Sequence, residues 1–193
     1  MVSVVAGLGN PGRRYEGTRH NLGFDVVDEV ARTLGIRFVE GRGEYMMARG
    51  SAQHAAVVLI KPTTYMNHSG VAVREVLDQE QVDPGSLIVV YDDFHLPLGM
   101  LRLRPGGSDG GHNGMASVLY HLQTDAIRRV RCGIRGEGFP DAAEEIVDYV
   151  LSPFHRAELE VKQKLVEHAR SSVLAVLGEG FEHAMNTYNG SVC

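Results

Sequence analysis

Cysteine, lysine and tryptophan are scarce in this chain of 193 residues. Its two cysteines, Cys132 and Cys193, lie far apart and match no zinc or redox spacing, which excludes a disulfide framework and a zinc finger. We expect a reduced, cytoplasmic protein in which Cys132 is a small strand residue and Cys193 is a loose terminal thiol. No apolar run is long enough for a membrane span, and the N-terminal run is too short for a signal peptide, so no membrane association is expected.

Positive charge is also in short supply, because the formal net charge is −5. This balance argues against a protein that coats nucleic acid. Nearly all the basic residues are arginines, and many of them are clustered. Clustered arginines can hold an RNA backbone by paired hydrogen bonds to phosphate, but charge alone favours solvated surface positions. The clusters are Arg13, Arg14 and Arg19; Arg102 and Arg104; and Arg128, Arg129, Arg131 and Arg135.

Hydrophobic periodicity predicts a single α/β domain over residues 1–193, with a twisted, mixed β-sheet surrounded by helices. Two adjacent strand-like runs in the first third of the chain suggest one antiparallel hairpin. Ser69 is a candidate helix cap, and Ser152-Pro153 has the order expected at the start of a long helix. The predicted strands lie near 2–6, 45–49, 55–60, 86–91, 100–104 and 129–134, and the predicted helices near 26–34, 69–77, 115–122, 152–177 and 181–188.

Polar segments follow several of the predicted strands. Residues 7–12 (GLGNPG) and 18–21 (TRHN) follow the first strand, residues 61–67 (KPTTYMN) follow the third, and residues 92–95 (DDFH) follow the fourth. A glycine-rich loop at 105–114 adds a histidine and an asparagine. Ligands of α/β sheets bind beyond the carboxyl ends of the strands, where these segments meet if their strands run parallel. Their side chains suit the binding of a carbonyl group and the transfer of a proton.

Residues 7–12 also match the G-x-G-x-x-G pattern of dinucleotide-binding loops. Such a loop passes directly into a helix that carries the pyrophosphate, but here Pro11 and a polar stretch intervene. The acidic residue expected at the end of a second strand is missing as well, because Asp28 and Glu29 fall within a helical stripe. We interpret the match as coincidence, with glycines that allow a tight turn and leave room for a substrate.

Two other hydrolase mechanisms are alternatives. Residues 106–110 match the serine motif G-x-S-x-G, but Pro105 interrupts the strand that should lead into Ser108. The glycines more simply describe a mobile loop over a substrate or a flexible connection. A metal site is the second alternative, although no familiar zinc spacing is present. Its candidate ligands are Asp92, Asp93, His95 and His112.

A simpler hypothesis needs neither a metal nor a covalent nucleophile. His20 acts as general base on a water molecule, Asp92 fixes its tautomer, and asparagine side chains hold the carbonyl and amide groups of the substrate. An activated ester is labile enough for this chemistry. Spacing alone does not bring His20 to Asp92, and the ordinary role of Asn10 or Asn67 is to cap a turn.

Taken together, these segments resemble bacterial peptidyl-tRNA hydrolases. The resemblance runs from the N-terminus to residues 185–189 (MNTYN). It implies a monomeric, cofactor-free α/β enzyme that cleaves the ester between a peptide and the 3′ end of tRNA, and so recycles tRNA. Its partner would be the acceptor stem and 3′ end of tRNA. The matching blocks are GLGNPG at 7–12, Tyr15, TRHNLG at 18–23, KPTTYMNHSG at 61–70 and GGHNG at 110–114.

The resemblance also implies roles for single residues. The catalytic histidine of the family falls on His20 and its supporting aspartate on Asp92. The asparagine that distinguishes blocked from free aminoacyl-tRNA falls on Asn10. No metal is implied. The other residues expected to bind the substrate are Tyr15, Tyr65, Met66, Asn67, His112 and Asn113.

Two positions depart from the family pattern. The family usually has Asp-Leu-Pro-x-Gly after the paired acids, whereas His95 precedes Leu-Pro-Leu-Gly here, which puts any role for an acid at that position in doubt. Arg102 and Arg104 stand where relatives often carry lysine, so positive charge for phosphate is kept. A non-catalytic RNA-binding module on the same fold is the competing class of function.

Overall fold

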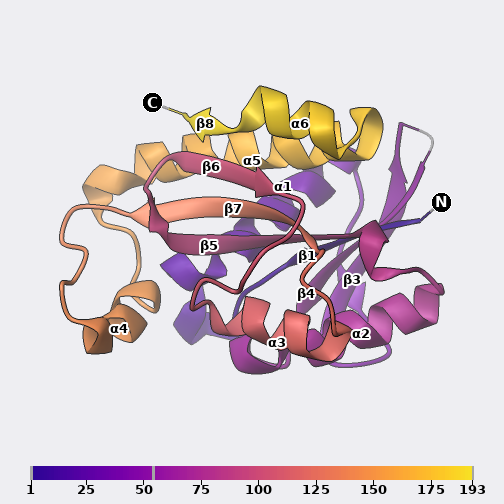
Figure 1. Ribbon diagram of the computed structural model, residues 1–193, viewed down its shortest axis with the longest axis horizontal. Coiled ribbons are helices and arrows are strands. Elements are labelled where there is room, and N and C mark those ends of the chain that lie inside the picture. The colour runs from indigo at the N-terminus through magenta and orange to yellow at the C-terminus, as the bar shows by residue number, and fades with distance from the viewer. Residues whose placement is uncertain (1, 54, 193) are drawn as a thin grey trace.

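The strands form one eight-stranded β-sheet with helices on both faces (Figure 1), which confirms the predicted α/β class and the mixed sheet. The computed structural model describes residues 2–53 and 55–192, so the predicted terminal thiol, Cys193, lies outside the described residues. The strands are β1 (Ser3–Gly7), β2 (Val39–Glu40), β3 (Tyr45–Ala52), β4 (Ala55–Pro62), β5 (Leu87–Pro97), β6 (Met100–Arg104), β7 (Arg128–Arg135) and β8 (Gly190–Ser191).

Parallel pairing forms the middle of the sheet. The strand order is β2-β3-β4-β1-β5-β7-β6-β8, in which β4, β1, β5 and β7 run parallel. In the central strand β1, Val5 is in register with Leu59 of β4 and Ile88 of β5. The predicted hairpin is confirmed as the antiparallel pair β3 and β4, and β6 pairs antiparallel with β7. The carboxyl ends of the four parallel strands therefore lie along one edge, where α/β proteins bind ligands.

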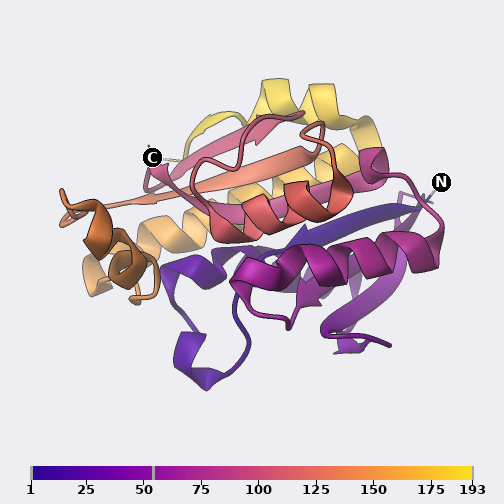
Figure 2. The same cartoon turned by 60° about the horizontal axis from the view of Figure 1, so that its bottom comes forward.

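Alternate residues of the strands face two different helix layers. The helices are α1 (Leu22–Leu34), α2 (Ser69–Glu80), α3 (Asn113–Leu122), α4 (Ile146–Val150), α5 (Leu159–Glu179) and α6 (Phe181–Tyr188). Val5 of β1 packs in a core with α1 and α5, whereas Val4 and Ala6 pack in a core with α2 and α3. Figure 2 shows α2 and α3 together on their face of the sheet. Within the described chain, no helix combines the length and apolar character needed to cross a membrane.

Close packing at the end of β1 explains most glycines of residues 7–12. A Cβ on Gly7 would lie 2.4 Å from the carbonyl oxygen of Gly23, and one on Gly9 would meet an aromatic ring at 2.7 Å. Gly12 has a φ of 97°, which serves the turn. Gly7 and Gly9 therefore let the start of α1 approach β1, rather than making room for a substrate as predicted. Short 3₁₀ turns separate this loop from α1, unlike a dinucleotide loop.

The long C-terminal helix begins later than predicted. Helix α5 starts at Leu159 rather than at Ser152-Pro153, because Pro153 is held in a β-bridge to an earlier part of the chain. The cap before the helix is a capping box in which the Glu158 carboxylate accepts the His155 backbone N–H at 2.7 Å. The predicted Ser69 cap is also wrong, since Ser69 is the first residue of α2 and its hydroxyl donates to a carbonyl three residues earlier.

Candidate active site

Segments that follow β1, β4 and β6 meet around β5 at the carboxyl edge of the parallel strands. Met66, after β4, donates its backbone N–H to the side-chain oxygen of Asn10 at 2.8 Å. Its sulfur lies so close to Gly114 in α3 that a Cβ there would be 2.4 Å away. His112, at the end of the glycine-rich loop, hydrogen-bonds Asp92 of β5 at 3.1 Å. The polar segments that the sequence places after strands therefore converge.

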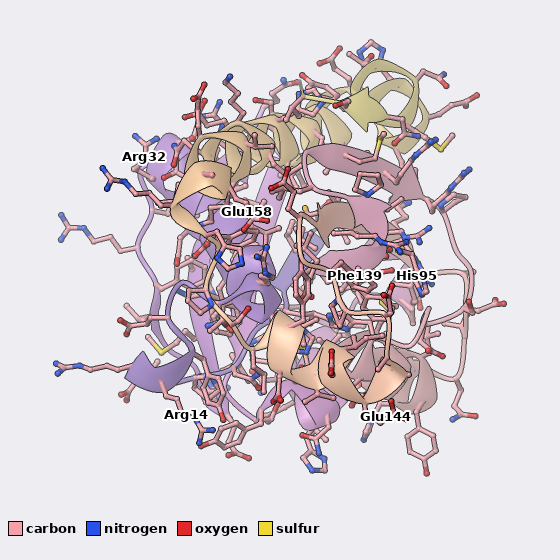
Figure 3. The ribbon with its side chains drawn as sticks, turned by 90° about the vertical axis from the view of Figure 1, so that its left-hand side faces the viewer. Arg14, Arg32, His95, Phe139, Glu144 and Glu158 are labelled. Atoms are coloured by element: carbon pink, nitrogen blue, oxygen red, sulfur yellow. The ribbon has the colours of Figure 1, made fainter. Side chains whose placement is uncertain are left out.

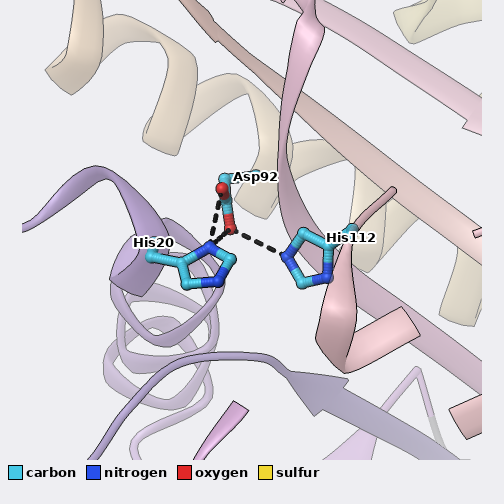
Figure 4. Close-up of side chains that lie close together, drawn as sticks. All are labelled: His20, Asp92 and His112. Atoms are coloured by element: carbon cyan, nitrogen blue, oxygen red, sulfur yellow. Dashed lines mark hydrogen bonds and ion pairs between the residues drawn. The ribbon is translucent and has the colours of Figure 1, made fainter. Parts of the chain in front are cut away.

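His20 and Asp92 are in direct contact (Figure 4). His20 lies in a 3₁₀ turn, Arg19–Asn21, that leads into α1, and its Nδ1 is 3.0 Å from each carboxylate oxygen of Asp92. Asp92 is fully buried and His20 is 8% exposed. With Nδ1–H donating to the carboxylate, the Nε2 atom has no partner among the described residues. A neutral imidazole in this tautomer offers its Nε2 lone pair, as a general base requires.

Asp92 lies within β5 rather than after it. The predicted strand ends near residue 91, but β5 continues to Pro97, which pairs with Arg135 of β7 beyond an irregularity that follows Asp93. Asp92 is in register there with Cys132, which is a buried strand residue as predicted. The next residue, Asp93, accepts a hydrogen bond from Arg131 Nε at 2.6 Å. The two adjacent acids thus have different partners, and of the two only Asp92 contacts the rings of His20 and His112.

His112 is the second donor to Asp92. Its Nδ1 accepts the Met115 backbone N–H at 3.1 Å and so caps α3. The proton of a neutral His112 then lies on Nε2, which donates to Asp92 at 3.1 Å. The rings of His20 and His112 lie 4.8 Å apart, and Tyr91 contacts the His112 ring at 4.9 Å between centroids. The sequence analysis named His112 as a substrate-binding residue and as a candidate metal ligand, but it did not predict the cap, which fixes the tautomer of His112.

Burial and charge act in opposite directions on the pKa of His20. Burial by itself lowers that pKa, but the charge of Asp92 and the hydrogen bond to it outweigh burial, so the pKa of His20 is raised above its ordinary 6.5. Burial by itself would raise the pKa of Asp92, but His20 and His112 hold it well below its usual range. Asp92 is therefore ionised at neutral pH, and His20 becomes a neutral base only above its raised pKa.

Asn10 is held in place by Asn21, the residue after His20. The Asn10 backbone N–H donates to Asn21 Oδ1 at 2.8 Å, and Asn21 Nδ2 donates to the Asn10 carbonyl at 3.0 Å. Asn10 Oδ1 is occupied by the Met66 N–H, and its Nδ2 has no partner within the described chain. The side chain therefore presents a donor to a ligand. No sequence pattern marks the role of Asn21 beyond its place beside His20.

Exposed side chains surround this buried centre. Tyr65 is 54% exposed and contacts Tyr15 edge-on, with ring centroids 6.4 Å apart. Its φ of 61° is a strained conformation for a tyrosine, and such strain is often found at binding sites. Asn67 lies exposed in the 3₁₀ turn after Tyr65, and Asn113 is the exposed first residue of α3. These residues rim the segments that hold Asn10 and His112.

The residues of the two alternative hydrolase mechanisms do not come together as complete sites in the described part of the chain. Asp93 is occupied by Arg131 and by the backbone N–H of His95. The His95 ring hydrogen-bonds the carbonyl of Gly110 at 3.1 Å. Ser108 is exposed, and its hydroxyl has no histidine partner in the part of the chain that the structure describes. Neither the serine nucleophile nor the four-residue metal set is assembled.

The buried cluster of His20, Asp92 and His112 has metal-ligand chemistry, because its ligand atoms lie within 4.8 Å of one another. A metal ion on His112 Nε2 would require the imidazole proton on Nδ1, where it would face the Met115 N–H donor. Metal binding would therefore break the cap of α3. The cap bond of His112 therefore favours proton transfer over metal binding at this cluster.

Two of the clustered arginines are buried rather than exposed. Arg19 is fully buried, and Arg129 is 2% exposed and donates to two carbonyls of the glycine-rich loop. The arginine clusters named from the sequence therefore cannot each bind phosphate with all of their members. Arg104 and Arg131 line a pocket of about 210 Å³ beside the same loop. Arg129 lines the same pocket from a buried position, so Arg104 and Arg131 are its two less buried arginines.

Comparison with known proteins settles the family. The family model for peptidyl-tRNA hydrolase matches residues 4–192. The chain belongs to the peptidyl-tRNA hydrolase family. A peptidyl-tRNA hydrolase from Alkaliphilus metalliredigens is 42% identical over 187 residues, which cover 97% of this chain and 99% of the relative. Another from a Synechococcus species is 47% identical, with 97% of this chain and 83% of the relative covered.

Solved structures agree with this membership. The crystal structure of peptidyl-tRNA hydrolase from Acinetobacter baumannii matches with a TM-score of 0.92 at 32% identity, covering 100% of this chain and 97% of that one. A uridine phosphorylase from Vibrio fischeri matches with a TM-score of 0.53 at 10% identity, so it shares the fold alone. The predicted resemblance to peptidyl-tRNA hydrolases is confirmed in sequence and in fold.

Proposed function

We propose that this chain cleaves the ester between the peptide and the 3′-terminal ribose of peptidyl-tRNA, which releases free peptide and returns tRNA to translation. Membership of the peptidyl-tRNA hydrolase family supports the reaction. The contact between His20 and Asp92 supports the assignment of the catalytic residues, because it leaves the Nε2 lone pair free beside an ionised carboxylate. The chemistry is that of a carboxylic ester hydrolase.

His20 acts as general base in this proposal. Its Nε2 takes a proton from a water molecule while the water oxygen bonds to the ester carbonyl carbon. The imidazolium that forms is stabilised by the Asp92 carboxylate, which lies 3.0 Å from Nδ1 and stays ionised. The tetrahedral intermediate then breaks its bond to the ribose oxygen, and that oxygen takes the proton from His20 Nε2. Peptide and tRNA leave, and His20 is neutral again.

Asparagine side chains distinguish peptidyl-tRNA from aminoacyl-tRNA in this proposal. The free Nδ2 of Asn10 suits the carbonyl oxygen of a peptide-like amide. Asn67 and Asn113 can each donate and accept, whereas the ammonium group of aminoacyl-tRNA only donates. The side chains that would complete the surroundings of the peptide are Tyr15, Tyr65, Met66 and His112.

A purified N-acetylated aminoacyl-tRNA, compared with its unblocked counterpart, tests the reaction. We expect tRNA release from the blocked substrate and release at least about fivefold slower from the free one, because an ammonium facing a donor loses a hydrogen bond worth roughly 1 kcal/mol. A chelator of transition metals that spares Mg²⁺, and the substitution Ser108→Ala, should both leave the rate unchanged. Inhibition by the chelator that added metal reverses would favour a metal site, and inactive Ser108→Ala would favour a serine nucleophile.

Arg104 and Arg131 are proposed to hold tRNA phosphate groups, since they share a pocket beside the glycine-rich loop. Arg131 already binds Asp93 through Nε, so Arg131→Gln can keep that donor while removing the charge. We expect Arg104→Ala with Arg131→Gln to raise KM and to lower the slope of log KM against log salt by about 0.7–0.9 per lost contact. Arg49→Ala, which removes a surface arginine paired with Glu80, is the control. An unchanged slope would contradict the phosphate assignment.

We further propose that residues 1–193 act as one catalytic domain, as a monomer in the cytoplasm. The monomer is supported by the composition of the site, since a single chain supplies His20, Asp92 and His112 in direct contact and Asn10 in its hydrogen bond with Met66. The cytoplasm is supported by the substrate, which arises where ribosomes release peptidyl-tRNA.

A further inference from the structure

Arg19, the residue before His20, lies in a cage built by the C-terminal part of the chain. It is fully buried, and its guanidinium lies over the rings of Tyr149 at 4.3 Å and Phe154 at 4.6 Å. It donates to the Glu158 carboxylate from Nη2 at 2.6 Å and from Nη1 at 3.4 Å. Figure 3 shows Glu158 at the beginning of α5. Aromatic stacking and an ion pair thus hold the same guanidinium.

The cage is itself attached to the sheet and to α5. The Tyr149 hydroxyl donates to the Ile134 carbonyl at 2.7 Å and accepts the Gly136 N–H at 2.9 Å, both at the end of β7. The Glu158 carboxylate also accepts the His155 N–H at 2.7 Å. Two walls of the cage, Tyr149 and Glu158, therefore have anchors that do not involve Arg19.

Backbone contacts add to this attachment. The Arg19 N–H donates to the Ser152 carbonyl at 3.0 Å, and Thr18 forms a β-bridge with Pro153. The two partners of the proposed catalytic pair are thus held by different parts of the fold: strand β5 places Asp92, and the C-terminal segment places the turn that carries His20. The distance between them depends on both supports.

We propose that Arg19 is a positioning residue for His20. The Arg19–Glu158 ion pair, in its aromatic cage, holds the 3₁₀ turn in the position at which Nδ1 of His20 contacts both oxygens of Asp92. This inference rests on the proposed catalytic role of His20. A buried ion pair is weak evidence for stability, since apolar replacements of such pairs are often neutral or stabilising. The forked hydrogen bonds and the aromatic stacking instead fix the orientation of the Arg19 side chain. A planar guanidinium allows both contacts, whereas the ammonium group of lysine does not.

Two substitutions that leave the catalytic pair intact test the proposal. Arg19→Lys keeps the charge but loses the fork and the stacking. Gly136→Ala acts from the opposite side, because a Cβ there would lie 1.9 Å from Glu158 Oε1 and must displace that carboxylate. Each should lower kcat about 10- to 100-fold and change KM less than about threefold, since a misplacement of about 1 Å can cost about 10²-fold. The acid limb of the pH profile should also move to lower pH, because a looser contact with Asp92 raises the pKa of His20 less.

Lys162→Met is the matched control. Lys162 of α5 lies 5.8 Å from the Phe154 ring and pairs with Asp25 of α1 at 2.6 Å, so its loss removes a neighbouring ion pair without touching the turn of His20. We expect the parent kcat and the parent acid limb for this variant at temperatures well below its melting point. Its melting temperature shows what the loss of a merely structural ion pair does to this region.

The outcomes separate the two hypotheses. If Arg19→Lys and Gly136→Ala lower the melting temperature but keep the parent kcat and acid limb, as Lys162→Met should, the positioning role is overturned. If either variant fails to fold, Glu158→Gln gives the same readout with an acceptor retained at the cap. Parent activity in a His20→Ala variant would overturn the proposed function instead, whatever the Arg19 variants do.

Discussion

His20→Ala should lower kcat by roughly 10²–10⁴-fold, which is the usual contribution of a general base. The KM for an N-acetylated aminoacyl-tRNA should change little, because the groups proposed to bind the substrate lie on other segments, such as Asn10 after β1 and Asn67 after β4. Steady-state turnover at saturating substrate, with a separate binding measurement, gives both quantities. Substrate binding without turnover in the parent protein would instead favour the non-catalytic RNA-binding module.

His20→Asn is the sharper form of this experiment. Its Nδ2 can still donate to Asp92, so the buried carboxylate keeps a partner, but no base remains. Turnover should fall as far as in the alanine variant. His168→Ala is the matched control, because His168 is half-buried on α5 and bonds the Tyr188 carbonyl at 3.0 Å, outside the site. If His20→Asn kept turnover within about threefold of the parent, a general base worth 10² or more would have to be another group.

The convergence of the site was predictable because parallel strands present their carboxyl ends at one edge of the sheet. Asn10 after β1 and Met66 after β4 reach this edge by topology alone. The contact between His20 and Asp92 was not predictable from spacing, since it depends on how one 3₁₀ turn is held against β5. The tautomer of His112 was not predictable either, because it follows from a single hydrogen bond at the cap of α3 that no sequence pattern specifies.

Predictions failed where a partner distant in sequence overrides a local pattern. Strand β5 was expected to stop at its two acids, but it continues to Pro97, which pairs with Arg135 of β7. Arg19 was grouped with surface arginines, yet it is buried because Glu158, 139 residues later in the chain, supplies its counter-charge. Ser152-Pro153 has the local form of a helix start, but the β-bridge of Pro153 delays the helix. Local chemistry indicates which residues are polar or apolar, and only the tertiary fold decides which of them pair.

Asp92→Asn should also lower kcat by about 10³–10⁴-fold, because it reverses the tautomer of the base. Two histidines donate to this carboxylate, His20 from Nδ1 and His112 from Nε2. In asparagine one of the two oxygens becomes an NH₂ group, and because His20 Nδ1 lies 3.0 Å from both oxygens of Asp92, His20 faces the NH₂ whichever way the amide is placed. His112 cannot change its tautomer without losing the Met115 N–H, so it takes the oxygen. The NH₂ then faces Nδ1 of His20, which must accept rather than donate. The imidazole proton of His20 therefore lies on Nε2, and Nε2 has no lone pair left to act as a base.

The same substitution should move the pH profile of the activity that remains. In the parent, kcat/KM should rise with pH through a midpoint above 6.5, because His20 works only when neutral and its pKa is raised. Without the charge of Asp92, burial is left as the main influence and lowers the pKa of His20, so the midpoint should fall. Asp93→Asn is the matched control, since Asp93 pairs with Arg131 and contacts neither histidine, and it should keep the parent midpoint and kcat. A midpoint that stayed above 6.5 in Asp92→Asn would mean that another group raises the pKa of His20. If Asp92→Asn had the same kcat as the parent protein, Asp92 would have no part in the mechanism.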